Sequence, residues 1–152
     1  MSPAPVDVVR EAPAPFVLLD GIAHVTESHL VGWRNFSEQP FWLALEAAAQ
    51  AAALHQRWLA DFGAHAFLLS LGACRWPDRP LTGRMELRAR LLGQTAGAAA
   101  YDVQLSLPDS PALSLPVHIG LVPYDDTFRQ DTLQERYRAL FRQLYAHSFR
   151  VC

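Results

Sequence analysis

An α+β fold, in which an antiparallel sheet wraps around one long buried helix, is predicted by two features of the 152-residue sequence. Residues 40–59, PFWLALEAAAQAAALHQRWL, are apolar on nearly every side at helical spacing, which is typical of a helix buried in a core. Several segments after them alternate apolar and polar residues, as half-buried strands do. A single helix that is apolar all round needs a sheet curled around it, so the two features belong together.

The strands are bounded by glycine, proline and aspartate turn signals. In residues 84–92, Met85, Leu87 and Ala89 point to one side and the intervening arginines and glutamate to the other. Extended segments are expected at 16–19, 22–26, 30–36, 67–76, 84–92, 101–107 and 113–121.

The central helix is expected to be capped by Ser37, with Pro40 in its first turn because the fixed φ of proline suits that position. It is expected to run to about Phe62 and to stop at Gly63.

A second helix is expected over residues 127–146, with Thr132 and Glu135 forming a capping box. It carries one apolar face, which must cover its own sheet or a partner. That face consists of Leu133, Tyr137, Leu140, Phe141, Leu144 and Tyr145.

These elements divide the chain into a flexible segment 1–15, one domain 16–124 and a C-terminal amphipathic extension 125–152. The hot-dog fold has this order of elements: a strand pair, a buried helix and then antiparallel strands. Its exposed sheet edges and half-covered helix are usually resolved by dimerisation, which also suits a hydrophobic fraction of 51%.

Composition excludes several function classes. A net charge of −2 gives no overall attraction to nucleic acid or to an anionic membrane. Cys74 and Cys152 are the only cysteines and form neither a disulfide framework nor a metal site, and no cofactor is expected. The N-terminus lacks the pattern of a secretory signal and no apolar run is long enough to span a bilayer, so a cytoplasmic location is expected.

Glu46 is the strongest candidate for function, because it is the one carboxylate in the apolar central segment. Enclosing an unpaired ionised carboxylate costs several kcal/mol, so a carboxyl group in an apolar site tends to hold a proton near neutrality and can act as an acid. Gln50 lies one turn further on the same face and is expected to bind Glu46 or a water. A structural role for Glu46, hydrogen-bonded by Gln50 or an arginine across a dimer, is the alternative.

Three motifs resemble the β-hydroxyacyl-acyl-carrier-protein dehydratases of the FabA/FabZ type. The family helix pattern Pro-Gly-Val-Leu, then Glu-Ala-x-Ala-Gln, matches here at Pro40, Leu43, Glu46, Ala47, Ala49 and Gln50. The family's Pro-Phe-Leu-Leu-Val-Asp is similar to PFVLLD at 15–20, and its strand leading into a Pro-x-x-x-Gly turn is similar to FLLSLGACRW followed by PLTG at 80–83.

The chain departs from this family at the catalytic loop. The family's Gly-His-Phe-Pro, whose histidine is the base, is replaced by FSEQ at 36–39, and the glycine that opens the helix is replaced by Phe41. Both changes, with Trp42, resemble the divergent dehydratase-like proteins of aryl-polyene and polyketide pathways. The histidines elsewhere in the sequence are expected to be ordinary surface residues rather than substitutes for the base.

The resemblance implies a set of site residues. Glu46 and Gln50 would be catalytic, the free N–H groups at the helix start would hold the thioester carbonyl, and an acidic acyl carrier protein would dock on arginines. The predicted substrate-binding residues are Phe41, Trp42 and Leu43, and the predicted docking residues are Arg75, Arg79 and Arg84. Core packing for Phe41 and Trp42, and a plain solvent face for the arginines, are the alternatives.

Three functions follow from these residues. The first is a 3-hydroxyacyl dehydratase-like protein of fatty-acid or polyketide synthesis, acting on acyl carrier protein or coenzyme A thioesters as a homodimer or as the non-catalytic half of a heterodimer with a histidine-bearing hot-dog relative. The second is a hot-dog thioesterase in which Glu46 activates water or attacks the thioester. The third is an acyl-binding or structural module without turnover.

Overall fold

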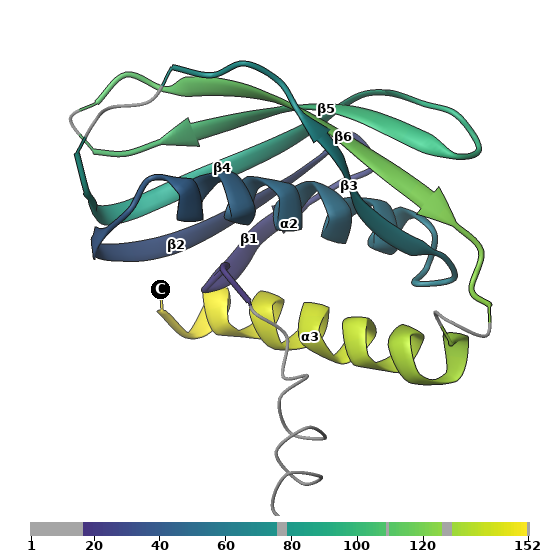
Figure 1. Cartoon of the computed structure of the whole chain (residues 1–152). Helices are drawn as coiled ribbons and strands as arrows, with labels where there is room; N and C mark the ends of the chain where they lie inside the picture. The colour runs from purple at the N-terminus through teal and green to yellow at the C-terminus, as the bar shows by residue number, and fades with distance from the viewer. Residues whose placement is uncertain (1–16, 76–78, 109, 126–128, 152) are drawn as a thin grey trace, which may run out of the picture.

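The computed structural model describes residues 17–75, 79–108, 110–125 and 129–151 (Figure 1). Six strands form one antiparallel sheet, in the order β1-β2-β4-β5-β6-β3. The helix α2 lies against one face of this sheet, and α3 lies in a further layer beyond α2 (Figure 1). The elements are β1 (Gly21–Val25), β2 (His29–Gln39), α2 (Trp42–Leu59), β3 (His65–Leu71), β4 (Leu81–Gln94), β5 (Ala98–Ser106), β6 (Leu113–Val122) and α3 (Gln130–Val151). The predicted α+β architecture of a sheet around a long helix, with an extra C-terminal helix, is confirmed.

The ends of α2 differ from the prediction. Ser37 does not cap the helix, because β2 continues to Gln39, which pairs with Leu81 of β4. Phe41 takes the N-cap position without a side-chain hydrogen bond, and the helix ends at Leu59. Phe62 is left beyond the helix with a positive φ of 59°.

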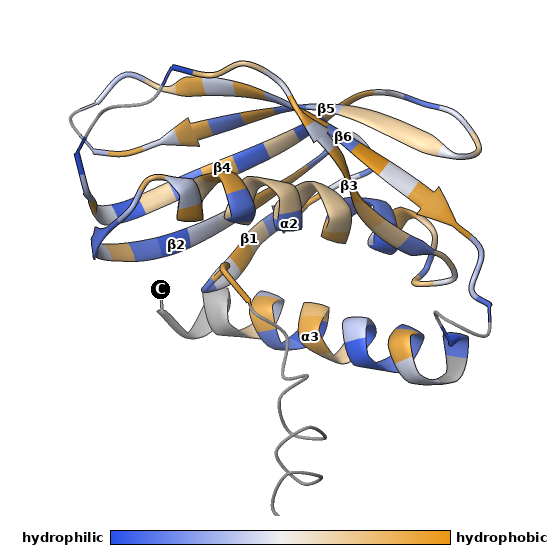
Figure 2. Ribbon diagram, in the orientation of Figure 1, coloured by the Kyte–Doolittle hydropathy of each residue, from blue (hydrophilic) through white to orange (hydrophobic). Residues whose placement is uncertain are grey.

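The alternation predicted for β4 is confirmed. Met85, Leu87 and Ala89 are buried beneath the sheet, whereas Arg84 and Arg88 are exposed on its outer face. Figure 2 shows this as alternating apolar and polar residues along the strand. The sheet therefore contributes one apolar face, and the core lies between that face and α2.

The prediction that α2 is buried on every side is wrong. Its sheet-facing side is fully buried, and the small side chains there let the helix approach the strands closely. That side is formed by Ala44, Ala47, Ala48, Ala51 and Ala52, each 0% exposed. The opposite side begins with Trp42, which is 54% exposed, and Glu46, which is also exposed. The sheet of a single chain thus leaves one face of the N-terminal half of α2 open.

The C-terminal helix α3 packs on its own chain, against β1 and the end of α2. The guanidinium carbon of the buried Arg57 lies 3.5 Å from the centroid of the Tyr137 ring, and Phe141 meets Phe62 edge to face at 5.7 Å. Burial lowers the pKa of Arg57, and the aromatic ring supplies the contact that a desolvated cation needs. The predicted capping box is wrong, because α3 begins at Gln130 and Thr132 lies inside it.

A buried polar network joins α2 to the sheet. Tyr101 of β5 donates its hydroxyl proton to Nδ1 of His55 at 2.6 Å and accepts a hydrogen bond from Nε2 of Gln56 at 2.8 Å. The other ring nitrogen of His55 donates to the carbonyl oxygen of Thr26 at 2.8 Å. His55 is 0% exposed, so the expectation of a surface histidine is wrong for this residue. Burial lowers the pKa of His55 and raises that of Tyr101.

Replacing Tyr101 by phenylalanine should lower the free energy of unfolding by about 1–3 kcal/mol, because it leaves buried donors and acceptors on His55 and Gln56 without a partner. Urea unfolding followed by circular dichroism measures this. Tyr137→Phe is the matched control, since it keeps the ring beneath Arg57 and should change stability far less. Equal stabilities for the two variants would contradict the role given to the network.

The network also predicts a pH dependence of stability. The pKa of His55 is lowered in the folded chain, so the unfolded chain binds more protons below its ordinary value of about 6.5. The contribution of His55 to stability is therefore complete above about pH 6.5 and is lost as the pH falls below it. Urea unfolding between about pH 7.5 and 5.5 should show a steeper loss for the wild type than for His55→Gln. Parallel curves would contradict this assignment.

Candidate functional site

Glu46 stands on the open face of α2, one turn after the exposed Trp42. Its side chain is exposed, and in the part of the chain that the structure describes we find no hydrogen bond or ion pair to its carboxylate. The described residues of the single chain therefore do not enclose this group. The physical reason is that the sheet covers only one side of the helix.

Gln50 follows Glu46 by one turn, but its described contact is with the N-terminal segment. Its Oε1 accepts a hydrogen bond from the backbone N–H of Leu18 at 2.8 Å. Leu18 and Leu19 are buried, and the Leu19 side chain lies against Gly32 of β2. Gln50 therefore holds the segment that precedes β1 against α2. This contact is structural, although Gln50 is predicted to be catalytic.

The predicted substrate-binding residues at the helix start separate into two groups. Phe41 and Leu43 are buried, at 5% and 8% exposure, whereas Trp42 points outward. The backbone N–H of Leu43 donates to the carbonyl oxygen of Pro40 at 3.2 Å, so it is not free to hold a thioester carbonyl. The N–H of Trp42 remains the candidate for that role.

None of the described histidine side chains contacts Glu46. His55 belongs to the buried network, and Nδ1 of His65 lies 3.0 Å from the guanidinium of Arg57. His118 is exposed beside Ser70, and His24 and His29 lie together in the first hairpin. Among the described side chains, no histidine stands beside Glu46 as the base that dehydration requires.

The edge strand β3 carries an exposed apolar surface. It ends the sheet, so one of its backbone edges has no strand partner among the described residues, and α2 packs beside it. The exposed apolar side chains on it are Phe67 at 37%, Leu68 at 40%, Leu69 at 52% and Leu71 at 36%. An exposed apolar edge strand favours pairing with another chain.

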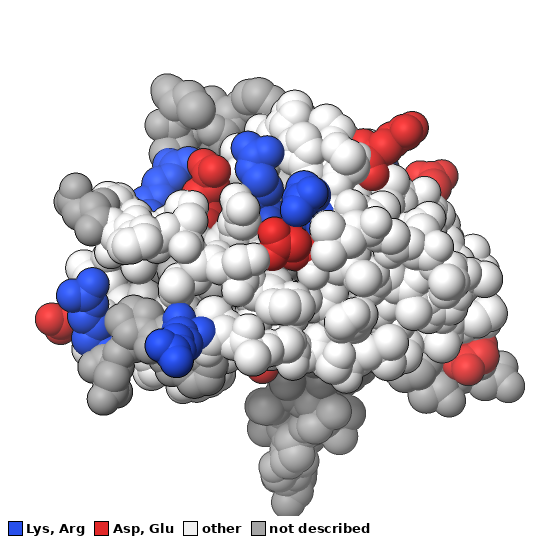
Figure 3. All heavy atoms as spheres, turned by 90° about the horizontal axis from the view of Figure 1, so that it is seen from above, with Lys and Arg blue, Asp and Glu red and all other residues white. Residues whose placement is uncertain are grey.

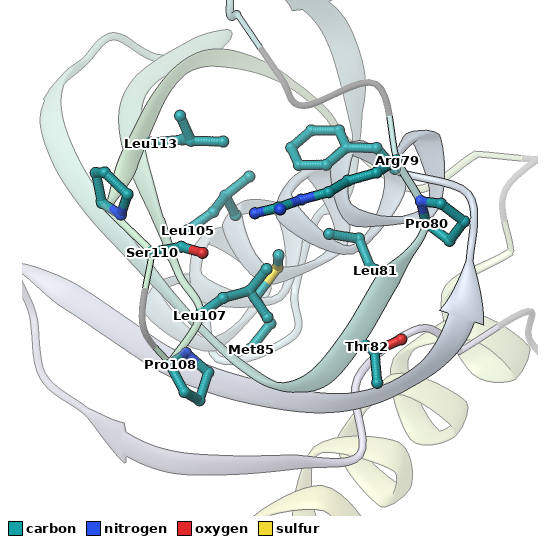
Figure 4. Close-up of a pocket in the computed structure, with 12 residues that line it drawn as sticks. Arg79, Pro80, Leu81, Thr82, Met85, Leu105, Leu107, Pro108, Ser110 and Leu113 are labelled. Atoms are coloured by element: carbon teal, nitrogen blue, oxygen red, sulfur yellow. The ribbon is translucent and has the colours of Figure 1, made fainter.

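A cavity of about 580 Å³ opens at the N-terminal end of α2, between β4 and the β5–β6 connection (Figure 4). Its floor is apolar and its rim includes Arg79, Thr82 and Ser110. The lining residues are Phe41, Arg79, Pro80, Leu81, Thr82, Met85, Leu105, Leu107, Pro108, Ser110, Pro111 and Leu113. Phe41 and Arg79 are the predicted site residues found here, and Glu46 is not in the lining. The alternation of apolar and polar residues in the strands predicts that the lining leucines belong to the core. It does not indicate that they surround a cavity.

The three predicted docking arginines are all exposed, but the contacts of Arg84 and Arg79 differ. Arg84 stacks over the buried Trp33, with its guanidinium carbon 4.2 Å from the ring centroid, and Arg79 lines the cavity. On the outer face of the sheet, arginines and acidic residues are interspersed (Figure 3). Docking of an acidic carrier protein on Arg75, Arg79 and Arg84 stays a prediction.

The described residues form neither a metal site nor a membrane span. No group of three or more His, Cys, Asp or Glu side chains there is arranged to hold a metal ion. No described helix has the length and hydrophobicity to cross a bilayer.

No family model and no curated protein matches the chain. Several solved structures are similar to it. The dehydratase heterocomplex ApeI:P from Xenorhabdus doucetiae is 20% identical, with 76% of this chain and 88% of that chain covered and a TM-score of 0.62. A thioesterase from Staphylococcus aureus is 13% identical over 68% of this chain and 93% of that one, with a TM-score of 0.60. A thioesterase from Pseudomonas aeruginosa is 14% identical over 67% and 80%, with a TM-score of 0.58.

These identities are too low to transfer an activity, but the shared architecture is clear. The neighbours include a dehydratase assembly and thioesterases, and all are similar to this chain over most of their own length. Together with the six-stranded antiparallel sheet around α2, they show that the protein has the hot-dog fold.

Proposed function

We propose that this protein is a dehydratase-like subunit that acts on 3-hydroxyacyl thioesters, with Glu46 as its acid and with a second hot-dog subunit covering the face of α2 on which Glu46 stands. The observation that carries the proposal is the position of this residue. Glu46 is the one carboxylate of α2, and it lies on the side that its own sheet leaves open.

The surroundings of Glu46 support a subunit interface. Trp42, one turn away, is 54% exposed, and the neighbouring edge strand β3 exposes Leu69 at 52%. Each exposes an apolar side chain of the kind that subunit interfaces bury. A partner seated on them would exclude water from Glu46 and would supply the apolar enclosure that favours the protonated acid.

Dehydration removes a proton next to the thioester carbonyl and expels the 3-hydroxyl group as water. Protonated Glu46 would give its proton to the departing hydroxyl, and a base would take the proton from the carbon. The partner must supply that base, because no described histidine of this chain contacts Glu46. This requirement favours a histidine-bearing hot-dog relative as the partner.

Thioester hydrolysis is the second candidate, and a specific observation favours it. The carboxylate of Glu46 stands without a neighbouring histidine, and hydrolysis by a single carboxylate needs none. Water would add to the carbonyl carbon, the carbon–sulfur bond would break, and a free acid and a thiol would be released. The helix pattern Glu-Ala-x-Ala-Gln, which resembles that of the dehydratases, argues against this second candidate.

The two reactions are distinguished by their products. The purified protein, alone and together with a histidine-bearing hot-dog protein encoded nearby, is incubated with 3-hydroxyoctanoyl and octanoyl thioesters of an acyl carrier protein and of coenzyme A. Mass spectrometry follows loss of water, and a thiol reagent follows hydrolysis.

The proposal predicts loss of water from the 3-hydroxyacyl thioester when both proteins are present, and little when this protein is alone. Thiol release by this protein alone would establish the second candidate instead. Enoyl formation by the relative alone, at the rate of the mixture, would contradict a role for this chain in the reaction.

A further inference from the structure

We propose that the cavity at the N-terminal end of α2 is a separate binding site for a single-chain anionic amphiphile, with the apolar chain in the cavity and the anionic head on Arg79. This goes beyond the thioester chemistry proposed at Glu46. The chemical class is a medium-length alkyl chain that ends in a carboxylate.

The cavity lies wholly within one chain. Leu81, Met85 and Leu105, at 2%, 1% and 2% exposure, form its inner wall, while Arg79 at its rim is exposed. Its volume of about 580 Å³ falls within the range of small-molecule sites. Phe41 closes it toward the helix, whereas Glu46 points away on the open face of α2, so the two sites are distinct.

Polarity within the cavity is graded. Figure 4 shows the side chains of Leu105, Leu107 and Leu113 around the space and the Arg79 side chain extended over it. Beyond Arg79, the polar side chains of the lining are Thr82 and Ser110, which are hydroxyl groups and carry no charge. No carboxylate among the described residues pairs with Arg79, and none lines the cavity. A guanidinium over an apolar space favours a ligand with an apolar body and an anionic head, because a carboxylate can accept two parallel hydrogen bonds from it.

The alkyl chain and the anionic head of the ligand make separable contributions to its binding affinity. Each methylene that enters the cavity should tighten binding about fourfold, so affinity should rise steeply from hexanoate to octanoate to decanoate. The contact with Arg79 is solvent-exposed, so its contribution should be smaller, about fivefold at low salt, and should weaken as salt is added.

Calorimetric titration of the full-length protein with decanoate, decyl phosphate, decanol and decyltrimethylammonium tests both parts. We expect decanoate to bind most tightly, decanol about fivefold more weakly and the cation more weakly still. Arg79→Gln should reduce decanoate affinity about fivefold and leave decanol unchanged, while Arg88→Gln, an exposed arginine on the outer face of β4, should change neither. Tighter binding of decyl phosphate than of decanoate would overturn the carboxylate assignment in favour of a phosphate head.

Leu113→Trp, which fills the cavity from a half-buried position, should abolish binding of all four ligands. Leu92→Trp, at a residue that is 58% exposed and outside the lining, is the control for the bulk of the new ring. Unchanged affinity in a folded Leu113→Trp protein, or equal binding of decanoate and decyltrimethylammonium, would overturn the proposal. Glu46→Gln should retain full decanoate affinity, so failure here and failure of the thioester function are told apart.

Discussion

Replacing Glu46 by glutamine should reduce thioester turnover by about two orders of magnitude or more, with folding unchanged. The amide cannot donate or accept the transferred proton, and general acid–base groups contribute roughly 10²–10⁴-fold to the rate. The side chain is exposed in the single chain and makes no described polar contact, so the free energy of unfolding should move by no more than about 0.5 kcal/mol. Steady-state turnover and urea unfolding measure the two effects.

Glu86→Gln is the matched control for this experiment. Glu86 is an exposed glutamate on the outer face of β4, and its replacement makes the same change in net charge. It should leave turnover within about twofold of the wild type, because Glu86 lies on the opposite face of the sheet from α2. Full activity of Glu46→Gln would reject Glu46 as the acid. Loss of folding would instead give this residue a structural role.

Replacing Leu69 by lysine should weaken assembly with the second subunit by at least about thirtyfold and should abolish turnover with it. Leu69 is 52% exposed at an irregularity of β3, where the register with β6 shifts between Leu68 and Ser70. A lysine there remains solvated in the free chain but places a charge in an apolar interface, and losses of 2 kcal/mol or more are typical at central interface positions.

Sedimentation velocity, with turnover measured on the same preparations, follows this change. Leu92→Lys is the control, because Leu92 is similarly exposed, at 58%, but lies on β4, away from the β3 edge of the sheet. We expect the control to assemble and turn over like the wild type. If Leu69→Lys kept its assembly while Leu92→Lys lost it, the interface would lie on another part of the molecule.

The sequence predicts the fold well because strand alternation and helix periodicity are local properties. The side of β4 that carries Met85, Leu87 and Ala89 could be assigned without coordinates. The ends of α2 could not be assigned from the sequence. Ser37 has the chemistry of a cap, but pairing of Gln39 with Leu81 extends β2 through it, and that partner lies far along the chain.

Predictions for the site depend on contacts that the sequence does not encode locally. Helical spacing puts Glu46 and His55 on different sides of α2, but it does not say which side the sheet covers. The apolar stretch around Glu46 therefore suggested enclosure, whereas the structure leaves this side open. His55 illustrates the converse, because its partners Tyr101 and Thr26 come from two separate strands or their ends. The cavity cannot be predicted for the same reason, since an empty space has no sequence pattern.

The open face of α2 can be examined directly by hydroxyl-radical footprinting of the protein in a preparation that turns over thioesters. Trp42, next to Glu46, is 54% exposed in the single chain, and Trp33 at 2% exposure provides the internal standard for a protected ring. If a second subunit encloses Glu46, Trp42 should be oxidised as slowly as Trp33 in the active preparation and faster once Leu69→Lys has separated the subunits. Rapid oxidation of Trp42 in a fully active preparation would contradict an active site enclosed between subunits.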